Sequence, residues 1–163
     1  MIWLIGNRGM LGTEVEALLK GKDVPFIATD QEVDIGNPDQ LEKFATDIPL
    51  TWIINCAAYT AVDQAEDEPD LAFRTNASGP LNIARIAKIK QAKLIHLSTD
   101  YVFDGAKEGT YTETDPPNPI GVYGRSKLAG EQHISQTLRQ HLIIRTGWLY
   151  GRHGHNFALT MLR

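Results

Sequence analysis

The chain has 163 residues, of which 42% are hydrophobic and 22% charged, and its formal charge is −4. This composition is typical of one globular domain with a sizeable core, and the acidic balance argues against a nucleic-acid-binding protein, which needs a basic face. No apolar stretch is as long as a membrane span, and the first residues lack the layout of a secretory signal. The one cysteine, Cys56, lies in an apolar run, so we expect a buried thiol and a reducing, cytoplasmic setting. From the charge and the short apolar stretches we expect neither nucleic acid nor membrane as a partner.

A glycine-rich segment follows the first predicted strand. Residues 1–5 have the pattern of a strand buried on both faces, and residues 13–20 are expected to form a helix. Between them the glycines are spaced G-x-x-G-x-x-G, which differs from the simplest dinucleotide fingerprint but follows the same logic. Gly6 permits a tight turn, Gly9 lets the backbone approach a pyrophosphate, and Gly12 lets helix and sheet pack closely. The free N–H groups of the helix N-terminus would face the phosphates, and a turn that merely needs glycines is the less favoured alternative.

Two charged residues give opposite indications about the cofactor. The second predicted strand covers residues 24–29 and ends at Asp30, a position that suits the ribose hydroxyls of NAD. Arg8, inside the glycine segment, could pair with the 2′-phosphate of NADP. NADH and NADPH therefore both stay open, and Asp34 and Ile35 are expected to flank the adenine.

The middle of the chain continues the alternation of helix and strand. Asn37 and Pro38 are typical of a helix start, and that helix is expected to end near residue 46. Residues 51–55 read as the next strand, whose carboxyl end should lie at the cofactor. The small or aromatic residues expected there are Ala57, Ala58 and Tyr59.

An acidic segment at residues 61–68 is expected to be solvated, and residues 69–90 to form one long helix. Gly79-Pro80 should bend that helix or start it afresh. Asn76 inside it is interpreted either as a hydrogen-bonded core amide or as a residue that holds a water near the site.

Hydroxyl groups follow the strand predicted at residues 92–97. Ser98 and Thr99 should point into the ligand crevice of a doubly wound sheet. The Gly- and Pro-rich segment at residues 106–121 is long for a plain connection and is interpreted as a functional loop. Another strand is expected at residues 141–145, and a helix at residues 156–163.

Tyr123 and Lys127 lie four residues apart on a helix expected to reach Gln140, so they share one face. Alone, this pair is weak evidence, but its neighbours give it meaning. Tyr123 would protonate a carbonyl oxygen as hydride arrives, Lys127 would lower the pKa of that phenol and bind the nicotinamide ribose, and Thr99 or Ser98 would polarise the carbonyl. The alternation of elements predicts an α/β fold, a Rossmann-like doubly wound parallel sheet.

At these residues the chain resembles the extended short-chain dehydrogenase/reductase family and, more narrowly, its dTDP-4-dehydrorhamnose reductase branch. The resemblance covers the whole chain and rests on five blocks, which are residues 6–12, Asn55-Cys56-Ala57-Ala58-Tyr59-Thr60-Ala61-Val62-Asp63, Ser98-Thr99-Asp100-Tyr101-Val102-Phe103-Asp104-Gly105, Tyr123-Gly124-Arg125-Ser126-Lys127-Leu128-Ala129-Gly130-Glu131 and Arg145-Thr146-Gly147-Trp148-Leu149-Tyr150-Gly151. It implies a catalytic trio of Thr99, Tyr123 and Lys127, and sugar contacts from Thr99, Asp100, Tyr101, Val102 and Trp148. The cofactor residues that it implies are Gly6, Arg8, Gly9, Met10, Leu11, Gly12, Asp30, Asp34, Ile35, Ala57, Ala58, Tyr59, Tyr123 and Lys127.

The implied reaction is NAD(P)H-dependent reduction of the C4 carbonyl of dTDP-4-dehydro-L-rhamnose to dTDP-L-rhamnose. The partner would be a dTDP-linked 4-keto-6-deoxyhexose, a homodimer is an open possibility, and no metal site is expected from the spacing of Cys and His. Members of the family run well past this length, so residues 1–163 are expected to be an NAD(P)-binding domain truncated before a substrate domain, and its own turnover is left open.

Three alternatives remain. The chain could be another extended short-chain reductase, or an epimerase or dehydratase of the same family, with Asp100 as the acidic residue that a dehydratase needs. It could also be a non-catalytic regulatory subunit like that of methionine adenosyltransferase. The intact trio weighs against this last alternative, because a binding protein has no need of a tuned acid.

Overall fold

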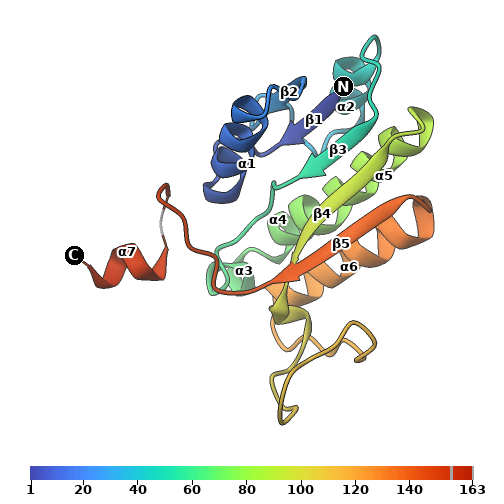
Figure 1. Cartoon of the computed structure of the whole chain (residues 1–163). Helices are drawn as coiled ribbons and strands as arrows, with labels where there is room; N and C mark the ends of the chain where they lie inside the picture. Colours follow the sequence, from blue (N-terminus) through green and yellow to red (C-terminus); the bar gives the residue numbers. More distant parts are fainter. Residues whose placement is uncertain (155, 163) are drawn as a thin grey trace.

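The computed structural model describes residues 1–154 and 156–162. Their strands form one parallel sheet in the order β2-β1-β3-β4-β5 (Figure 1). The chain therefore winds outward from β1 in both directions, which confirms the predicted doubly wound sheet. The strands are β1 (Ile2–Ile5), β2 (Phe26–Thr29), β3 (Trp52–Asn55), β4 (Lys93–Thr99) and β5 (His141–Thr146).

Helices cover both faces of this sheet. In Figure 1, α1 lies on one face and α2, α5 and α6 lie on the other. In the described part of the chain, no helix is both long and apolar enough to cross a membrane. The helices are α1 (Met10–Gly21), α2 (Pro38–Ala45), α3 (Gln64–Asp67), α4 (Pro69–Phe73), α5 (Gly79–Ile89), α6 (Val122–Thr137) and α7 (Phe157–Met161). The final residue of the helix predicted at 156–163 lies outside the described residues.

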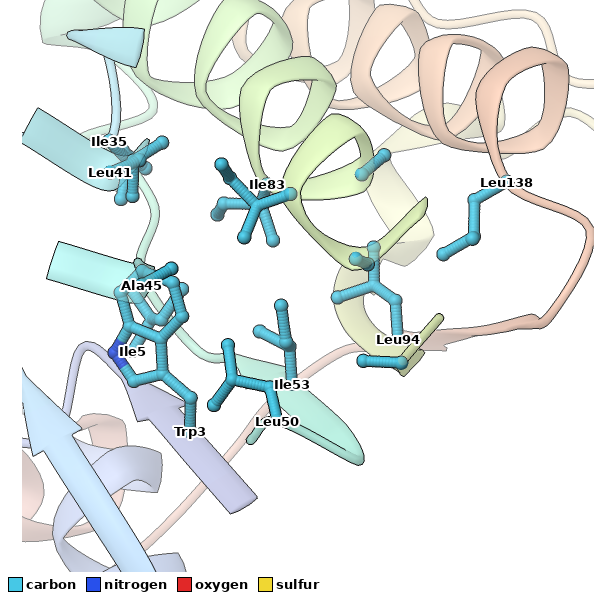
Figure 2. Close-up of a cluster of buried hydrophobic side chains, with 14 of the residues drawn as sticks. Trp3, Ile5, Ile35, Leu41, Ala45, Leu50, Ile53, Ile83, Leu94 and Leu138 are labelled. Atoms are coloured by element: carbon cyan, nitrogen blue, oxygen red, sulfur yellow. The ribbon is translucent and has the colours of Figure 1, made fainter. Parts of the chain in front are cut away.

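The main core lies between the sheet and helices α2, α5 and α6 (Figure 2). Trp3 and Ile5 of β1 are buried there, while Leu4 between them is buried on the opposite face. This two-sided burial explains the unbroken apolar run at the start of the chain. The indole of Trp3 donates a hydrogen bond to Thr29 Oγ1 at 2.9 Å, so β1 and β2 are also joined by side chains.

Strand β5 departs from this pattern. Its run of apolar residues resembles a strand buried on both faces, but only one face is covered in the described structure. Ile143 packs against the core, whereas Leu142 and Ile144 are exposed.

The segment predicted as one helix over residues 69–90 contains a π-helical turn at Arg74–Ser78 between α4 and α5. The turn comes just before Pro80, which lacks the N–H that would bond to the carbonyl of Asn76 four residues earlier. Helix α6 packs closely here, because a Cβ on Gly130 would overlap that carbonyl oxygen. The predicted bend is therefore a local widening of the helix.

The acidic segment at residues 61–68 is not simply solvated as expected. Ala65 is fully buried, and the carboxylate of Glu66 accepts a hydrogen bond from the backbone N–H of Val122 at 2.6 Å. That N–H belongs to the first turn of α6, where backbone donors have no partner within the helix. The segment therefore fixes the start of the helix that carries Tyr123.

The close contact at Gly130 makes a prediction for stability. Gly130→Ala should lower the free energy of unfolding by about 2 kcal/mol, because the new methyl group has no space. Gly21→Ala is the matched control, since it also lies in a helix but a Cβ there meets nothing within 4 Å. The control should be neutral or stabilising by about 0.5 kcal/mol. Urea unfolding of both variants checks this, and equal effects would contradict the close packing of α6.

Candidate active site

The glycine segment has the geometry of an anion-binding turn. Gly6 adopts a φ of 81°, and a Cβ on Gly12 would overlap the carbonyl oxygen of Gly6. A Cβ on Gly9, in contrast, would meet no protein atom closer than 3.5 Å. Packing within the protein therefore requires Gly6 and Gly12 but leaves the space beside Gly9 free. Gly9 caps α1 without any side-chain hydrogen bond, so the first N–H groups of that helix stay available for a ligand.

A cleft of about 750 Å³ opens at the carboxyl ends of the strands beside this turn. It lies around β1 and β3, where the winding of the sheet reverses, the usual ligand position in doubly wound folds. The predicted cofactor residues along its wall are Gly6, Arg8, Gly9, Asp30, Asp34, Ile35, Ala57, Ala58 and Tyr59. The sequence interpretation missed five further residues of the wall, which are Ile5, Gln31, Val33, Cys56 and Thr75.

Charged groups alternate in sign around one end of the cleft. Asp30 accepts hydrogen bonds from the backbone N–H of Arg8 at 3.0 Å and of Gln31 at 2.9 Å. The guanidinium of Arg8 lies 3.3 Å from the carboxylate of Glu32, and Asp34 pairs with Arg74. Backbone hydrogen bonds to Glu32 lower the pKa of its carboxyl group. Groups suited to ribose hydroxyls and to a phosphate thus occupy the same end, so the geometry does not favour one cofactor.

The predicted cofactor residues that do not line the cleft are Met10, Leu11, Gly12, Tyr123 and Lys127. Met10 instead meets the segment before α7, where Asn156 Nδ2 lies 3.6 Å from its sulfur.

The floor of the cleft is held by a buried hydrogen-bond chain that the sequence interpretation missed. Asn55 accepts a hydrogen bond from the N–H of Ala57 at 3.1 Å, and its amide nitrogen lies 3.0 Å from His96 Nδ1. Burial lowers the pKa of His96 well below its usual value, so this imidazole is neutral. The sequence feature that could have predicted this bond is the pair of polar residues, one at the end of β3 and one within β4.

Asn76 is the hydrogen-bonded core amide that we gave as one interpretation. It accepts from the backbone N–H of Tyr59 at 2.9 Å and donates to the Tyr59 carbonyl and to Ser126 Oγ, each at 3.0 Å. One side chain in the π-helical turn therefore joins the cleft wall to helix α6.

The structure brings the three predicted catalytic residues together. Thr99 ends β4, while Tyr123 and Lys127 lie on the first two turns of α6, and all three are buried. The hydroxyl of Thr99 accepts from the N–H of Tyr101 and contacts Asp100 Oδ1, each at 3.2 Å. Ser98, the alternative hydroxyl, donates instead to Glu131 at 2.5 Å. Of the two hydroxyls, Thr99 is the one directed toward Tyr123.

The expected lowering of the Tyr123 pKa by Lys127 is wrong for this structure. Burial raises the pKa of the Tyr123 phenol, a hydrogen bond with Thr99 partly opposes this, and the charge of Asp100 adds to it. The ammonium of Lys127 donates to the carbonyl of Leu97 at 2.7 Å, so it is held by the strand. Burial lowers the pKa of Lys127 to about 8, and the negative charge of Glu131 opposes this effect.

A second cavity of about 470 Å³ is lined by Tyr123, Asp100 and Tyr101. The rings of Tyr101 and Tyr123 meet edge to face, with centroids 5.6 Å apart. Val102, also expected to contact the sugar, has a fully buried side chain. Trp148 lies outside this cavity, is 68% exposed and packs against Phe157. Two of the residues predicted to contact the sugar, Asp100 and Tyr101, thus line the same cavity.

Comparison with known proteins identifies the family of this chain. A family model described as the RmlD substrate binding domain matches residues 1–163. The chain belongs to this family. It is 42% identical to the dTDP-4-dehydrorhamnose reductase of Escherichia coli K12 and 41% identical to the dTDP-4-keto-6-deoxy-D-glucose reductase of Streptomyces niveus. Each match covers 99% of this chain and 56% or 57% of the relative, so the chain spans little more than half the length of these relatives.

A solved structure shows the same relation. The dTDP-4-dehydrorhamnose reductase of Bacillus anthracis, in complex with NADP, is 41% identical and superposes with a TM-score of 0.95 over 99% of this chain and 58% of its own. The resemblance to the dTDP-4-dehydrorhamnose reductase branch is thus confirmed.

The burial of Lys127 makes a prediction for pH dependence. Its pKa falls from 10.5 to about 8 on folding, so between these values the unfolded chain binds more protons and this group makes stability rise with pH. The free energy of unfolding of the wild type should therefore rise relative to that of Lys127→Met by about 1 kcal/mol per pH unit from pH 8 to 10. Urea unfolding at several pH values checks this, with the exposed Lys88→Met as the control. Parallel curves for wild type and Lys127→Met would contradict the burial of the charge.

Proposed function

We propose that the chain is the NAD(P)H-binding part of an oxidoreductase that reduces a carbonyl group of a dTDP-linked sugar. The observation that carries this proposal is the position of the trio. Thr99, Tyr123 and Lys127 meet at the carboxyl end of the sheet, and Tyr123 borders a second cavity. A proton donor beside a dinucleotide-type cleft is what carbonyl reduction needs.

The residues of the first cleft fit a dinucleotide. The space beside Gly9 would admit a pyrophosphate, the free N–H groups of α1 would bind it, and the cleft volume suits a cofactor. Asp30 would bind the adenosine ribose, and Arg8 could bind a 2′-phosphate, so we propose that either NADH or NADPH is accepted. When bound, the cofactor supplies the hydride.

The trio would act on the substrate carbonyl. Thr99 would donate a hydrogen bond to the carbonyl oxygen, and Tyr123 would give that oxygen its proton. Because burial keeps the Tyr123 phenol protonated at neutral pH, this residue is ready to donate. Lys127, held at the Leu97 carbonyl, would bind the nicotinamide ribose.

For the substrate, we propose dTDP-4-dehydro-L-rhamnose, reduced at C4 to dTDP-L-rhamnose. The names of the relatives support a dTDP-linked 4-keto-6-deoxy sugar, and the Streptomyces niveus protein acts on a different member of that class. Other reductases, and epimerases or dehydratases of nucleotide sugars, are the alternative, but the relatives at 41–42% identity are named as reductases. A cytoplasmic setting and a homodimer stay predictions.

Cofactor binding tests this proposal directly on the chain. NADPH or NADH should quench the tryptophan fluorescence of the purified protein. Gly9→Ala should weaken binding about tenfold or more, about 1.4 kcal/mol, because its methyl group would occupy the space left for the pyrophosphate. Gly21→Ala is the matched control and should bind as the wild type does. If neither NADPH nor NADH quenches the fluorescence, the cofactor assignment is wrong.

The role of Tyr123 needs a polypeptide that reduces the sugar, be it this chain or a longer one that contains it. Tyr123→Phe removes the phenolic proton and keeps the ring, so sugar-dependent NADPH oxidation should fall at least about a hundredfold while cofactor affinity is kept. Spectrophotometric assays at 340 nm and fluorescence titration measure the two quantities. Turnover that survives the substitution would show that another group is the acid.

A further inference from the structure

Glu131 is a buried carboxylate that joins three elements of the fold. It lies on α6 and is 4% exposed. Ser98 of β4 donates to it at 2.5 Å, and Arg145 of β5 donates through Nε at 3.0 Å and through Nη2 at 2.6 Å. Its oxygens are thus bonded to the carboxyl ends of two neighbouring strands.

The helix spacing places Glu131 in line with the trio. Tyr123, Lys127 and Glu131 follow one another at intervals of four residues, so they lie on the same face of α6. Ser98 directly precedes Thr99, and Arg145 lies three residues before Trp148. A shift of the Glu131 carboxylate would therefore be passed to both strand ends that border the site.

The titratable groups around Lys127 come from several elements of the fold. Cys56 follows β3, and burial raises the pKa of its thiol to about 11, so it is neutral. His96 of β4 is also neutral, and Tyr123 keeps its proton. Among the described residues, Glu131 is thus the charged acidic group that acts on the ammonium, and Arg145 is the cation paired with Glu131.

We propose that Glu131 is a positioning residue for the Tyr123–Lys127 site, which fixes the ends of β4 and β5 against α6 and sets a negative charge one helical turn from the Lys127 ammonium. The contribution of this role to catalysis rests on the proposed function, because that function assigns Lys127 its use. A merely structural ion pair between Glu131 and Arg145 would stabilise the fold without changing the protonation of Lys127. The titration of Lys127 therefore separates the two interpretations.

The experiment follows the Lys127 side chain by NMR. In protein labelled with ¹³C-lysine, the Cε signal of Lys127, assigned by its loss in Lys127→Met, is titrated from pH 6 to 11. Glu131→Gln keeps the shape and removes the charge, so the midpoint should fall by about one pH unit, a tenfold loss of proton affinity. Arg145→Gln removes the cation that is paired with Glu131, so the negative charge of Glu131 acts more strongly on Lys127 and the midpoint should rise. Glu42→Gln, an exposed carboxylate on α2, is the matched control and should leave the midpoint unchanged.

The outcomes separate the two proposals. Opposite shifts in Glu131→Gln and Arg145→Gln support the positioning role, and if the first variant does not fold, the rise in the second still tests it. Midpoints that match the wild type in the folded variants would overturn the role. NADPH quenching of the wild type, measured on the same preparation, tests the proposed function independently.

Discussion

The burial of one ammonium group between helix α6 and strand β4 is the constraint on which the candidate site depends. A buried charge is costly unless it is bonded, and Lys127 meets that need with the Leu97 carbonyl and the charge of Glu131. The bond to Leu97 requires α6 to lie in one register along β4. The same register sets Tyr123, one turn earlier, beside Thr99. The position of the phenol therefore follows from how the lysine is held.

Close packing of α6 also connects the site to the cofactor cleft. Gly124 and Gly130 leave no space for a Cβ against the carbonyls of Tyr101 and Asn76, so backbone meets backbone at two points along α6. Asn76 lies in the π-helical turn and bonds both to Tyr59 in the cleft wall and to Ser126 in α6. The widened turn therefore holds the cleft wall and helix α6 at a fixed distance through the side chain of Asn76.

Local features of this molecule and the meeting of Thr99 with Tyr123 could be predicted from the sequence, and the other contacts between distant segments could not. The glycine segment, the parallel strands and the shared face of Tyr123 and Lys127 follow from spacing within a few residues. The partners of Glu131, the Glu66 carboxylate at the start of α6 and the widened turn depend on which segments meet. The predicted direction of the Tyr123 pKa shift is wrong for the same reason. The sequence shows its charged neighbour, but burial and the Leu97 carbonyl are visible only in the fold.

The sign of this pKa shift bears on the direction of the proposed chemistry. A phenol with a lowered pKa would lose its proton near neutral pH and act as a base, as oxidation of an alcohol requires. Burial of Tyr123 favours the neutral phenol, so the proton needed for reduction is already in place. Lys127, with a pKa of about 8, is mainly charged at neutral pH, but its ammonium is held by the Leu97 carbonyl and does not offset the effect of burial on the phenol. The buried phenol is therefore suited to donate a proton, which is the direction that the proposed reduction requires.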